Sequence, residues 1–562
     1  MTTRTGLSAF ILLALSAATA AGIGCGSTTR SSAYSDDPKA GKDGGAEAGK
    51  GFGSNEDGLL LDPPNVVLFI DTAKTPPEPA TQTYTVKIKT GGSGEDVSAK
   101  TTFELVDDVG KFTGNVFTSK TTLPDGVPGM TTIVKATSGE YKGTAQLTIV
   151  ALRQSGDNRD FFFLEPHNQP HSPANDVLKF GTNIQKVDVA FVMDTTGSMG
   201  GSITNLANAL TSTIVPALTA VIPSVEMAVV DYKDYPVGSY GGGGDFPVKV
   251  YQTMTSTVSL VNAGVAKYVA SGGADGPESQ IPAMYHVLTG DELTWPGGSV
   301  PKHTPPAGRW GGVNFRPGAV PVIVNITDID WHGEGHSPYS GIPAPTMSNL
   351  MATFIKTNAR FVDITSGDES QANELSDVSG SNVPTSAFGT VSGCASVQCC
   401  TGINGAGRLN TTPSGNCRLN FLHSGGNGVS SAIAKAIQAI AIGTQFDINA
   451  KVSNDPSNEN GVDAVAAFMQ GLRAMDEGDA TQGCPAQTAV DTNGDGVKDT
   501  FKSVRVGTPV CFEVIPKDNT TVSAAAIVQF YNAFIDILGQ PGNIQLDRRT
   551  VKFLVPPGDS VK

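Results

Sequence analysis

The chain has few charged side chains, and positive ones are the scarcest. Charged residues make up 16% of the 562 positions, with 38 Lys and Arg against 53 Asp and Glu, so the formal net charge is −15. Such a surface repels nucleic acid and anionic lipid, and it favours cationic partners such as metal ions. At roughly 150 residues per domain, the length excludes a single compact domain and predicts three or four.

The N-terminal apolar run, Leu7 to Ala21, is too short for a membrane-spanning helix with stop-transfer flanks. We predict that residues 1–24 are a secretory signal peptide. Small residues directly before Cys25 resemble the lipobox of bacterial lipoproteins, which implies lipidation of Cys25 and an exported protein at the outer membrane or cell surface. An ordinary signal peptide cut nearby is the alternative. Residues 25–58 hold almost no large apolar side chains and are predicted to be a flexible tether.

Six cysteines remain when Cys25 is set aside, and an even number in an exported chain predicts three disulfides. We expect Cys484 to pair with Cys511. The other four lie in one loop rich in Gly and Asn, where three connectivities are open: Cys394, Cys399, Cys400 and Cys417. Two separated CxxC pairs are absent, so a zinc site is less well supported than disulfides.

Two regions are predicted to be mostly β-structure. Over residues 59–152, short β-rich runs alternate with turn residues, which is typical of an antiparallel sandwich. Their order resembles bacterial immunoglobulin-like repeats, so we expect a spacer domain there. Residues 153–185 are expected to be a connector. β-rich runs return over residues 444–562 and predict a C-terminal β-rich domain.

Between these regions, over residues 186–443, apolar strand-like runs alternate with helical patterns. Val187 to Met193 and Val320 to Ile326 are predicted strands. This alternation predicts a doubly wound, mostly parallel sheet with helices on both faces. Ligands of such sheets bind at the carboxyl ends of the strands.

Hard oxygen donors follow two of these strands. Asp194, Thr196 and Ser198 come directly after the first, and Asp328 follows the later one. Glu278 opens a helix between them and is placed to reach the same edge of the sheet. Oxygen donors of this kind suit Mg²⁺, Mn²⁺ or Ca²⁺.

This pattern resembles the von Willebrand factor type A (VWA) fold and its metal-ion-dependent adhesion site. The second-loop Thr of that site is missing, and the segment around Glu278 is similar to integrin β-subunit I-like domains, in which a Glu serves instead. The resemblance implies a Rossmann-like VWA domain with Mg²⁺ or another divalent cation held by five residues: Asp194, Thr196, Ser198, Glu278 and Asp328.

The same resemblance implies adhesion rather than catalysis. An Asp or Glu of a protein partner would fill an open coordination position on the cation. Met199 and Gly200 stand where integrins carry paired acidic residues, so we expect no second metal site directly after the motif.

Several alternatives remain open from the sequence. Asp194 and Ser198 could merely cap the following helix. The segment from His332 to His336 is not HExxH and is expected to be a polar loop beside the site. Ser198 does not lie in a GxSxG motif. The competing functions are a cell-envelope scaffold with a structural metal and a metal-assisted hydrolase.

A calcium-type loop is predicted in the C-terminal region. Oxygens stand at positions 1, 3, 5, 7 and 9 of an EF-hand-like pattern, from Asp491, Asn493, Asp495, the Val497 carbonyl and Asp499. Position 12 is Lys502, so the loop resembles the short calcium loops of thrombospondin type 3 and dockerin modules. A turn without metal is the alternative.

Overall fold

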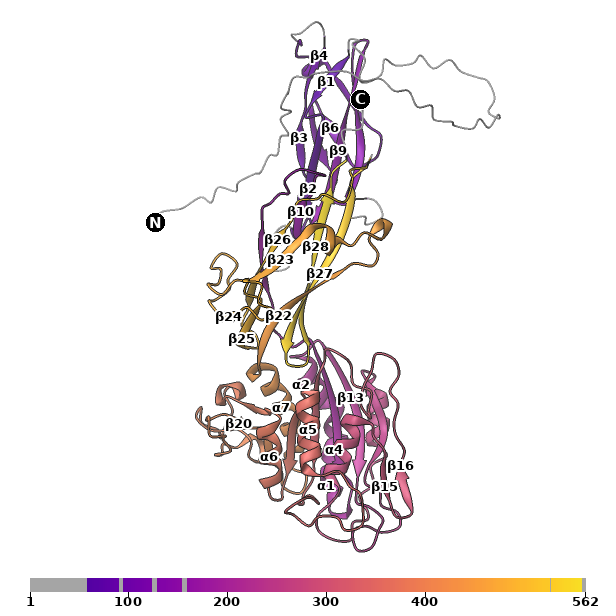
Figure 1. Cartoon of the computed structure of the whole chain (residues 1–562), viewed down its shortest axis with the longest axis vertical. Helices are drawn as coiled ribbons and strands as arrows, with labels where there is room; N and C mark the ends of the chain where they lie inside the picture. The colour runs from indigo at the N-terminus through magenta and orange to yellow at the C-terminus, as the bar shows by residue number, and fades with distance from the viewer. Residues whose placement is uncertain (1–57, 90–93, 124–128, 154–158, 526, 558–562) are drawn as a thin grey trace, which may run out of the picture. The chain divides into compact units, whose positions relative to one another are not determined.

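The computed structural model (Figure 1) describes residues 58–89, 94–123, 129–153, 159–525 and 527–557. The predicted signal peptide, Cys25 and the tether up to residue 57 lie outside these ranges. The described part is a mixed α/β structure rich in strands and divides into two compact units. The first contains the described residues up to 160, with 521–530 and 554 onward, and the second contains 161–520 and 531–553. Within the described part, no helix combines the length and apolarity that spanning a bilayer requires.

The first unit is built from strands. Its sheets are β2-β9-β8-β5, β3-β7-β6 and β1-β4, and they share one apolar core that includes Tyr84, Phe117 and Leu147. One pair differs from the antiparallel expectation, because β2 and β9 are parallel. The long chain segment between these two strands makes a parallel return possible. The strands are β1 (Leu59–Asp62), β2 (Asn65–Asp71), β3 (Thr81–Thr83), β4 (Thr85–Ile88), β5 (Thr102–Leu105), β6 (Gly110–Thr113), β7 (Val116–Ser119), β8 (Gly129–Ser138) and β9 (Tyr141–Leu152).

The second unit contains a six-stranded sheet of order β14-β13-β12-β17-β18-β21. All neighbours are parallel except β14, which is antiparallel to β13. The strands are β12 (Lys186–Asp194), β13 (Ser224–Tyr232), β14 (Lys249–Thr255), β17 (Val320–Ile326), β18 (Arg360–Thr365) and β21 (Asn420–Leu422). The mixed α/β character predicted for this region is therefore confirmed, and we call this the central sheet.

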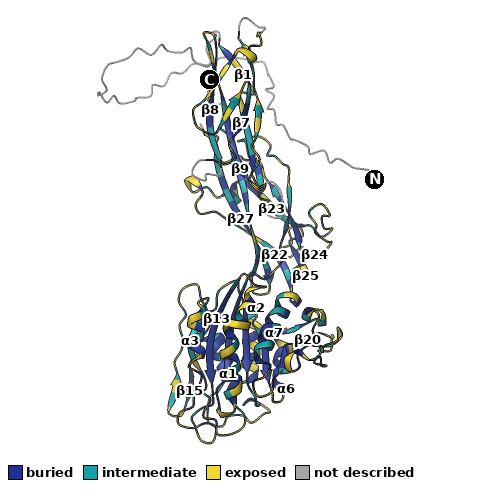
Figure 2. Cartoon of the chain, turned by 180° about the vertical axis from the view of Figure 1, so that it is seen from behind, coloured by how far each residue is buried: buried dark blue, intermediate teal, exposed yellow. Residues whose placement is uncertain are grey.

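Helices cover both faces of the central sheet. They are α1 (Gly200–Ala209), α2 (Val215–Thr219), α3 (Val258–Val265), α4 (Gln280–Thr289), α5 (Met347–Thr357), α6 (Ser370–Val378) and α7 (Val429–Gly443). Figure 2 shows α1, α3 and α7 on one face, and α4 and α5 pack on the other. Two short strand pairs complete the region: β15 (Leu293–Trp295) with β16 (Gly298–Val300), and β19 (Asn382–Val383) with β20 (Cys417–Arg418).

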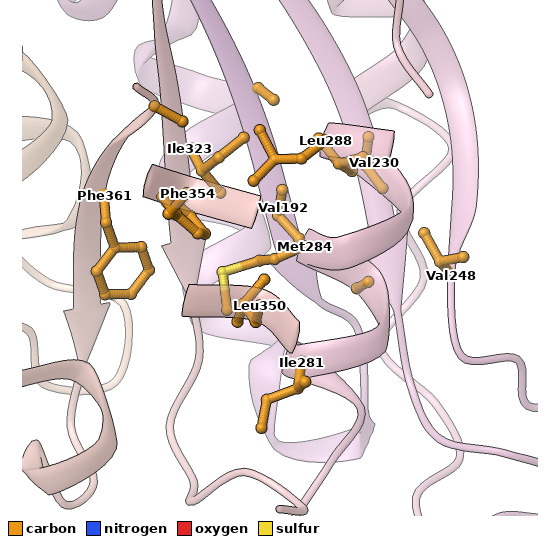
Figure 3. Packing of buried hydrophobic residues seen from close by; sticks show 14 of the residues in the cluster. Val192, Val230, Val248, Ile281, Met284, Leu288, Ile323, Leu350, Phe354 and Phe361 are labelled. Atoms are coloured by element: carbon orange, nitrogen blue, oxygen red, sulfur yellow. The ribbon is translucent and has the colours of Figure 1, made fainter. Parts of the chain in front are cut away.

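The apolar runs become strands because both faces of the sheet are buried. All seven residues of β17 are buried, and so are eight of the nine residues of β12. On the face in Figure 3, Met284 of α4 and Leu350 of α5 pack among Val192, Val230 and Ile323 of the sheet. This core fixes the strand ends and therefore the loops that follow them.

The remaining strands of the second unit form two further sheets, β10-β28-β27-β22-β25-β24 and β11-β26-β23. The expected connector, 153–185, is not a simple linker, because β10 pairs in one sheet and β11 in the other. Strands and helix are β10 (Phe161–Leu164), β11 (Asp176–Phe180), β22 (Gln445–Asn454), α8 (Ala464–Phe468), β23 (Met469–Ala474), β24 (Ala489–Val490), β25 (Thr500–Arg505), β26 (Val510–Pro516), β27 (Gln529–Gln540) and β28 (Ile544–Val555).

Three disulfides join the six described cysteines. Cys484 pairs with Cys511 as expected. The four cysteines of the loop pair as Cys394–Cys400 and Cys399–Cys417, which settles the connectivity that the sequence left open. Disulfides persist in oxidising compartments, so they indicate an exported or extracellular protein.

Candidate metal centre

Five parallel strands of the central sheet end at one edge, which we call the carboxyl edge. β12 ends at Asp194, β13 at Tyr232 and β17 at Ile326. The loops after these strands therefore lie next to one another, although they are far apart in the sequence.

Asp194 is fully buried at this edge. Its Oδ1 accepts hydrogen bonds from the backbone N–H (2.9 Å) and the hydroxyl (2.7 Å) of Thr196, and its Oδ2 accepts one from the Thr327 hydroxyl (2.9 Å). Burial raises the pKa of Asp194 to about 6, and the neighbouring Asp328 carboxylate adds to that shift. Residue Met199, at the N-cap of α1, makes no side-chain capping bond. Asp194 therefore bonds to Thr196 in its own loop and to Thr327, and it does not cap α1.

Ser198 joins two loops at the surface. Its side chain is exposed, and its hydroxyl donates a hydrogen bond of 3.1 Å to Oδ1 of Asp328, 130 residues further along the chain. Asp328 is itself half-buried. One hydroxyl and one carboxylate thus meet where solvent can reach them.

Glu278 is buried beside the same loops. Its backbone is fixed on both sides, because its N–H donates to the Asp330 carbonyl (3.1 Å) and its carbonyl accepts from the N–H of His332 (3.0 Å). Oε2 of its carboxyl group is buried with no hydrogen-bond partner. Burial, followed by the charge of Asp194, raises the pKa of Glu278 to about 10. A buried carboxylate in this situation requires either a proton or a cation.

Gly273 shows how closely Glu278 approaches the first loop. It has a φ of +79°, and a Cβ placed on it would lie 2.8 Å from Oε1 of Glu278 and 3.2 Å from Cβ of Thr196. The glycine therefore leaves the space in which these two side chains come together.

We call Asp194, Thr196, Ser198, Glu278 and Asp328 the rim site. The structure brings all five to the carboxyl edge, as the contacts above show. The carboxylates of Asp194, Glu278 and Asp328 lie further apart than a compact metal cluster requires: within the described residues, they do not all offer ligand atoms within 4.8 Å of one another. The hydroxyls of Thr196 and Ser198 bond to Asp194 and Asp328, and hydroxyl and carboxylate oxygens together suit a hard cation.

A second cluster at the same edge meets that closer criterion. Asp234, Asp275 and His332 each offer one ligand atom, and these atoms all lie within 4.8 Å of one another. Nε2 of His332 is 3.2 Å from Oδ2 of Asp234 and 3.4 Å from Oδ1 of Asp275. We call this cluster the histidine site. One imidazole and two carboxylates are a donor set that can hold a divalent metal.

Neighbouring groups hold the histidine site in place. The Tyr339 hydroxyl donates to Oδ1 of Asp234, and Nδ1 of His332 contacts the Ser337 carbonyl. Burial alone would lower the pKa of His332, but its hydrogen bonds to Asp234 and Ser337 raise it above the ordinary value. His332 and Asp234 are almost completely buried, whereas Asp275 is partly exposed.

The sequence alone did not indicate the histidine site. β13 ends at Tyr232 and so places Asp234 just beyond the carboxyl edge. From the sequence, His332 to His336 are expected only to form a polar loop. A loop is what the structure shows, with paired hydrogen bonds between Gly333 and His336, but His332 is buried while His336 is exposed. An acidic residue shortly after an apolar strand was the available signal.

The predicted calcium loop is exposed and lies between β24 and β25. Both carboxylate oxygens of Asp491 accept backbone hydrogen bonds, from Gly494 (2.7 Å) and Gly496 (2.8 Å), and these bonds lower the pKa of Asp491. Asp495 accepts from the Val497 N–H, and Asp499 accepts from the Thr492 hydroxyl. The loop is therefore ordered by its own backbone, and calcium binding there remains a prediction.

Comparison with known proteins adds little to this picture. No family model matches the chain, and no curated protein matches it. Among solved structures, a von Willebrand factor type A protein from Catenulispora acidiphila is 9% identical with a TM-score of 0.25, over 82% of this chain and 75% of that one. Proximal thread matrix protein 1 from the mussel byssus is 11% identical with a TM-score of 0.25, over 49% of this chain and 50% of that one. Similarity at this level transfers no function to this chain.

Proposed function

We propose that this protein binds other proteins through a divalent cation, Mg²⁺ or a similar ion, held at the rim site. The observation that carries the proposal is the buried, unpartnered Oε2 of Glu278 next to Asp194, close to the exposed pair of Ser198 and Asp328. Buried carboxylates without partners favour a cation, and the exposed pair leaves that position open to solvent.

The hydroxyl and carboxylate residues of the rim site have different roles in binding the cation. Ser198 and Thr196 offer hydroxyl oxygens as direct ligands, while Asp194, Glu278 and Asp328 supply the negative charge. A bound divalent cation supplies an electrophilic position that an acidic side chain of a partner can fill. Asp194 is held by three hydrogen bonds, so the donor positions are set before any partner arrives.

The cellular setting belongs to the same proposal. An exported chain lipidated at Cys25, with residues 25–58 as a tether, would present the rim site at the outer membrane or cell surface. The three disulfides support export. In this account the protein is an adhesion protein and not an enzyme, and a calcium ion in the Asp491 loop would serve a structural role.

The test is capture of binding partners from cell-envelope extracts by the full chain. Three conditions are compared: Mg²⁺, chelator, and Mg²⁺ with Ser198→Ala. We expect partners that are retained with Mg²⁺ and lost in the other two conditions. Ser212→Ala is the matched control, because Ser212 is also exposed but bonds only within its own helical segment. Identical sets of captured proteins in all conditions would remove the proposal.

One observation favours a second function, a scaffold with a structural metal. The histidine site is largely buried, so an ion there would have little access to a partner. Under that alternative, chelator lowers the melting temperature of the chain while capture by Ser198→Ala remains normal.

A further inference from the structure

Lys233 is the first residue after β13, and its side chain is buried at 5% exposure. Its ammonium donates hydrogen bonds to the backbone carbonyls of Thr195, Val269 (3.1 Å) and Ser271. Thr195 belongs to the loop that carries the first residues of the rim site. Ser271 belongs to the loop that leads to Glu278.

These two loops also bond to each other directly. The N–H of Ser271 donates to the Thr195 carbonyl (3.0 Å), and the N–H of Gly197 donates to the Gly272 carbonyl (3.2 Å). Lys233 therefore occupies the place where the loops meet. A lysine ammonium carries three hydrogens, and all three are used on carbonyl groups.

The charge of Lys233 nevertheless acts on carboxylates. The ammonium interacts electrostatically with the carboxylates of Asp231, Asp245, Asp194 and Glu278, and these interactions oppose the lowering of its pKa by burial. The carboxylates of Asp194 and Glu278 thus gain a compensating charge while no oxygen of theirs is taken up by the ammonium. Oε2 of Glu278, which has no hydrogen-bond partner, therefore stays available to another cation.

We propose that Lys233 is an internal counter-cation of the rim site, which stabilises the metal-free protein and weakens the binding of the divalent ion. This inference rests on the proposed function. A fixed positive charge near a bound Mg²⁺ repels it, so the ion is held more loosely and can exchange. Without the ion, the same charge reduces the repulsion among the buried carboxylates.

The experiment is Lys233→Met in the full chain, with Mg²⁺ binding followed by calorimetry and melting followed with and without Mg²⁺. The relevant binding is the component that Ser198→Ala weakens, which separates the rim site from the histidine site. We expect Mg²⁺ to bind at least about tenfold more tightly, because the variant removes the repulsion between one fixed positive charge and a divalent ion. We also expect a larger increase in melting temperature on adding Mg²⁺ than in the wild type.

Two variants serve as controls. Lys267→Met removes an exposed positive charge nearby and should leave Mg²⁺ affinity as in the wild type. Lys233→Arg keeps the charge and should also keep the wild-type affinity. A residue that only supported the loops would lower both melting temperatures equally and leave the Mg²⁺-induced increase unchanged.

The outcomes test the counter-cation role of Lys233 separately from the proposed function of the rim site. Mg²⁺ affinity that is unchanged or weaker in Lys233→Met overturns the counter-cation role. If that variant fails to fold even with Mg²⁺, Lys233→Arg decides: wild-type affinity supports the role, and altered affinity overturns it. A wild-type chain that binds no Mg²⁺ at the rim site would instead overturn the proposed function itself.

Discussion

Replacing Ser198 with Ala should weaken divalent-ion binding while leaving the fold intact. Ser198 is exposed, and its side chain makes one hydrogen bond, to Asp328. Exposed substitutions of this kind usually change the free energy of unfolding by no more than about 0.5 kcal/mol. A change in metal binding would therefore not be a consequence of unfolding.

The size of the effect follows from the contact that is lost. A hydrogen bond or ligand contact to a charged group is worth about 1.5–3 kcal/mol. That range corresponds to Mg²⁺ affinity that is about 10- to 100-fold lower. Asp194→Ala would be a poorer test, because Asp194 is buried and accepts three hydrogen bonds, so its removal would also destabilise the domain.

The assay is calorimetric titration of the full chain with Mg²⁺, with thermal melting of the same samples. Ser212→Ala is the control for the loss of an exposed hydroxyl near α1. Equal Mg²⁺ affinities for the wild type and Ser198→Ala would refute the reasoning, because the rim site would then not contain this hydroxyl.

Three further predictions concern other parts of the second unit. Replacing Cys484 and Cys511 with Ser opens a link of 27 residues and should lower the free energy of unfolding by about 3 kcal/mol, measured by denaturant titration. Burial, followed by the charge of Asp518, raises the pKa of Glu165 from 4.5 to about 8, so the folded state keeps a proton that the unfolded state releases. Stability should therefore fall between pH 4.5 and 8, by up to about 1.4 kcal/mol per pH unit, and Glu165→Gln should remove that fall. His332→Ala should abolish the component of metal binding that Ser198→Ala leaves at full affinity, measured by calorimetry with Mn²⁺.

These predictions have distinct contradicting results. An unchanged denaturation midpoint would show that the Cys484 to Cys511 link contributes nothing to stability. For Glu165, the same pH dependence in wild type and variant would show that its carboxyl group does not titrate as its burial implies. Mn²⁺ binding whose affinity is changed by neither Ser198→Ala nor His332→Ala would place that ion elsewhere.

The sequence predicted the part of the fold that depends on local pattern. β17 covers Val320 to Ile326 as expected, because a strand buried on both faces reads as one apolar run. Asp194 and Asp328 were found for the same reason, since each follows such a run. Glu278 came from the family resemblance, and the structure then placed it beside Thr196.

Features that depend on distant partners could not be predicted. Phe161 to Leu164 form β10, which pairs with β28 almost four hundred residues further along the chain. No local signal in so short a run identifies that partner. The connectivity within the cysteine loop was left open because four cysteines in one segment allow three pairings.

The role proposed for Lys233 could not be predicted from the sequence either. A lysine after a strand normally extends into water, and only the loops around Thr195 and Ser271 bury it. The histidine site needed the fold for a similar reason, since its members come from three separate loops.

The most direct test of the account is a crystal structure of the chain soaked in Mn²⁺, with anomalous scattering used to locate the ion. The account predicts an anomalous peak between the Ser198 hydroxyl and the carboxylates of Asp328 and Glu278. A peak at the histidine site alone, with the rim site carrying none at saturating Mn²⁺, would contradict it.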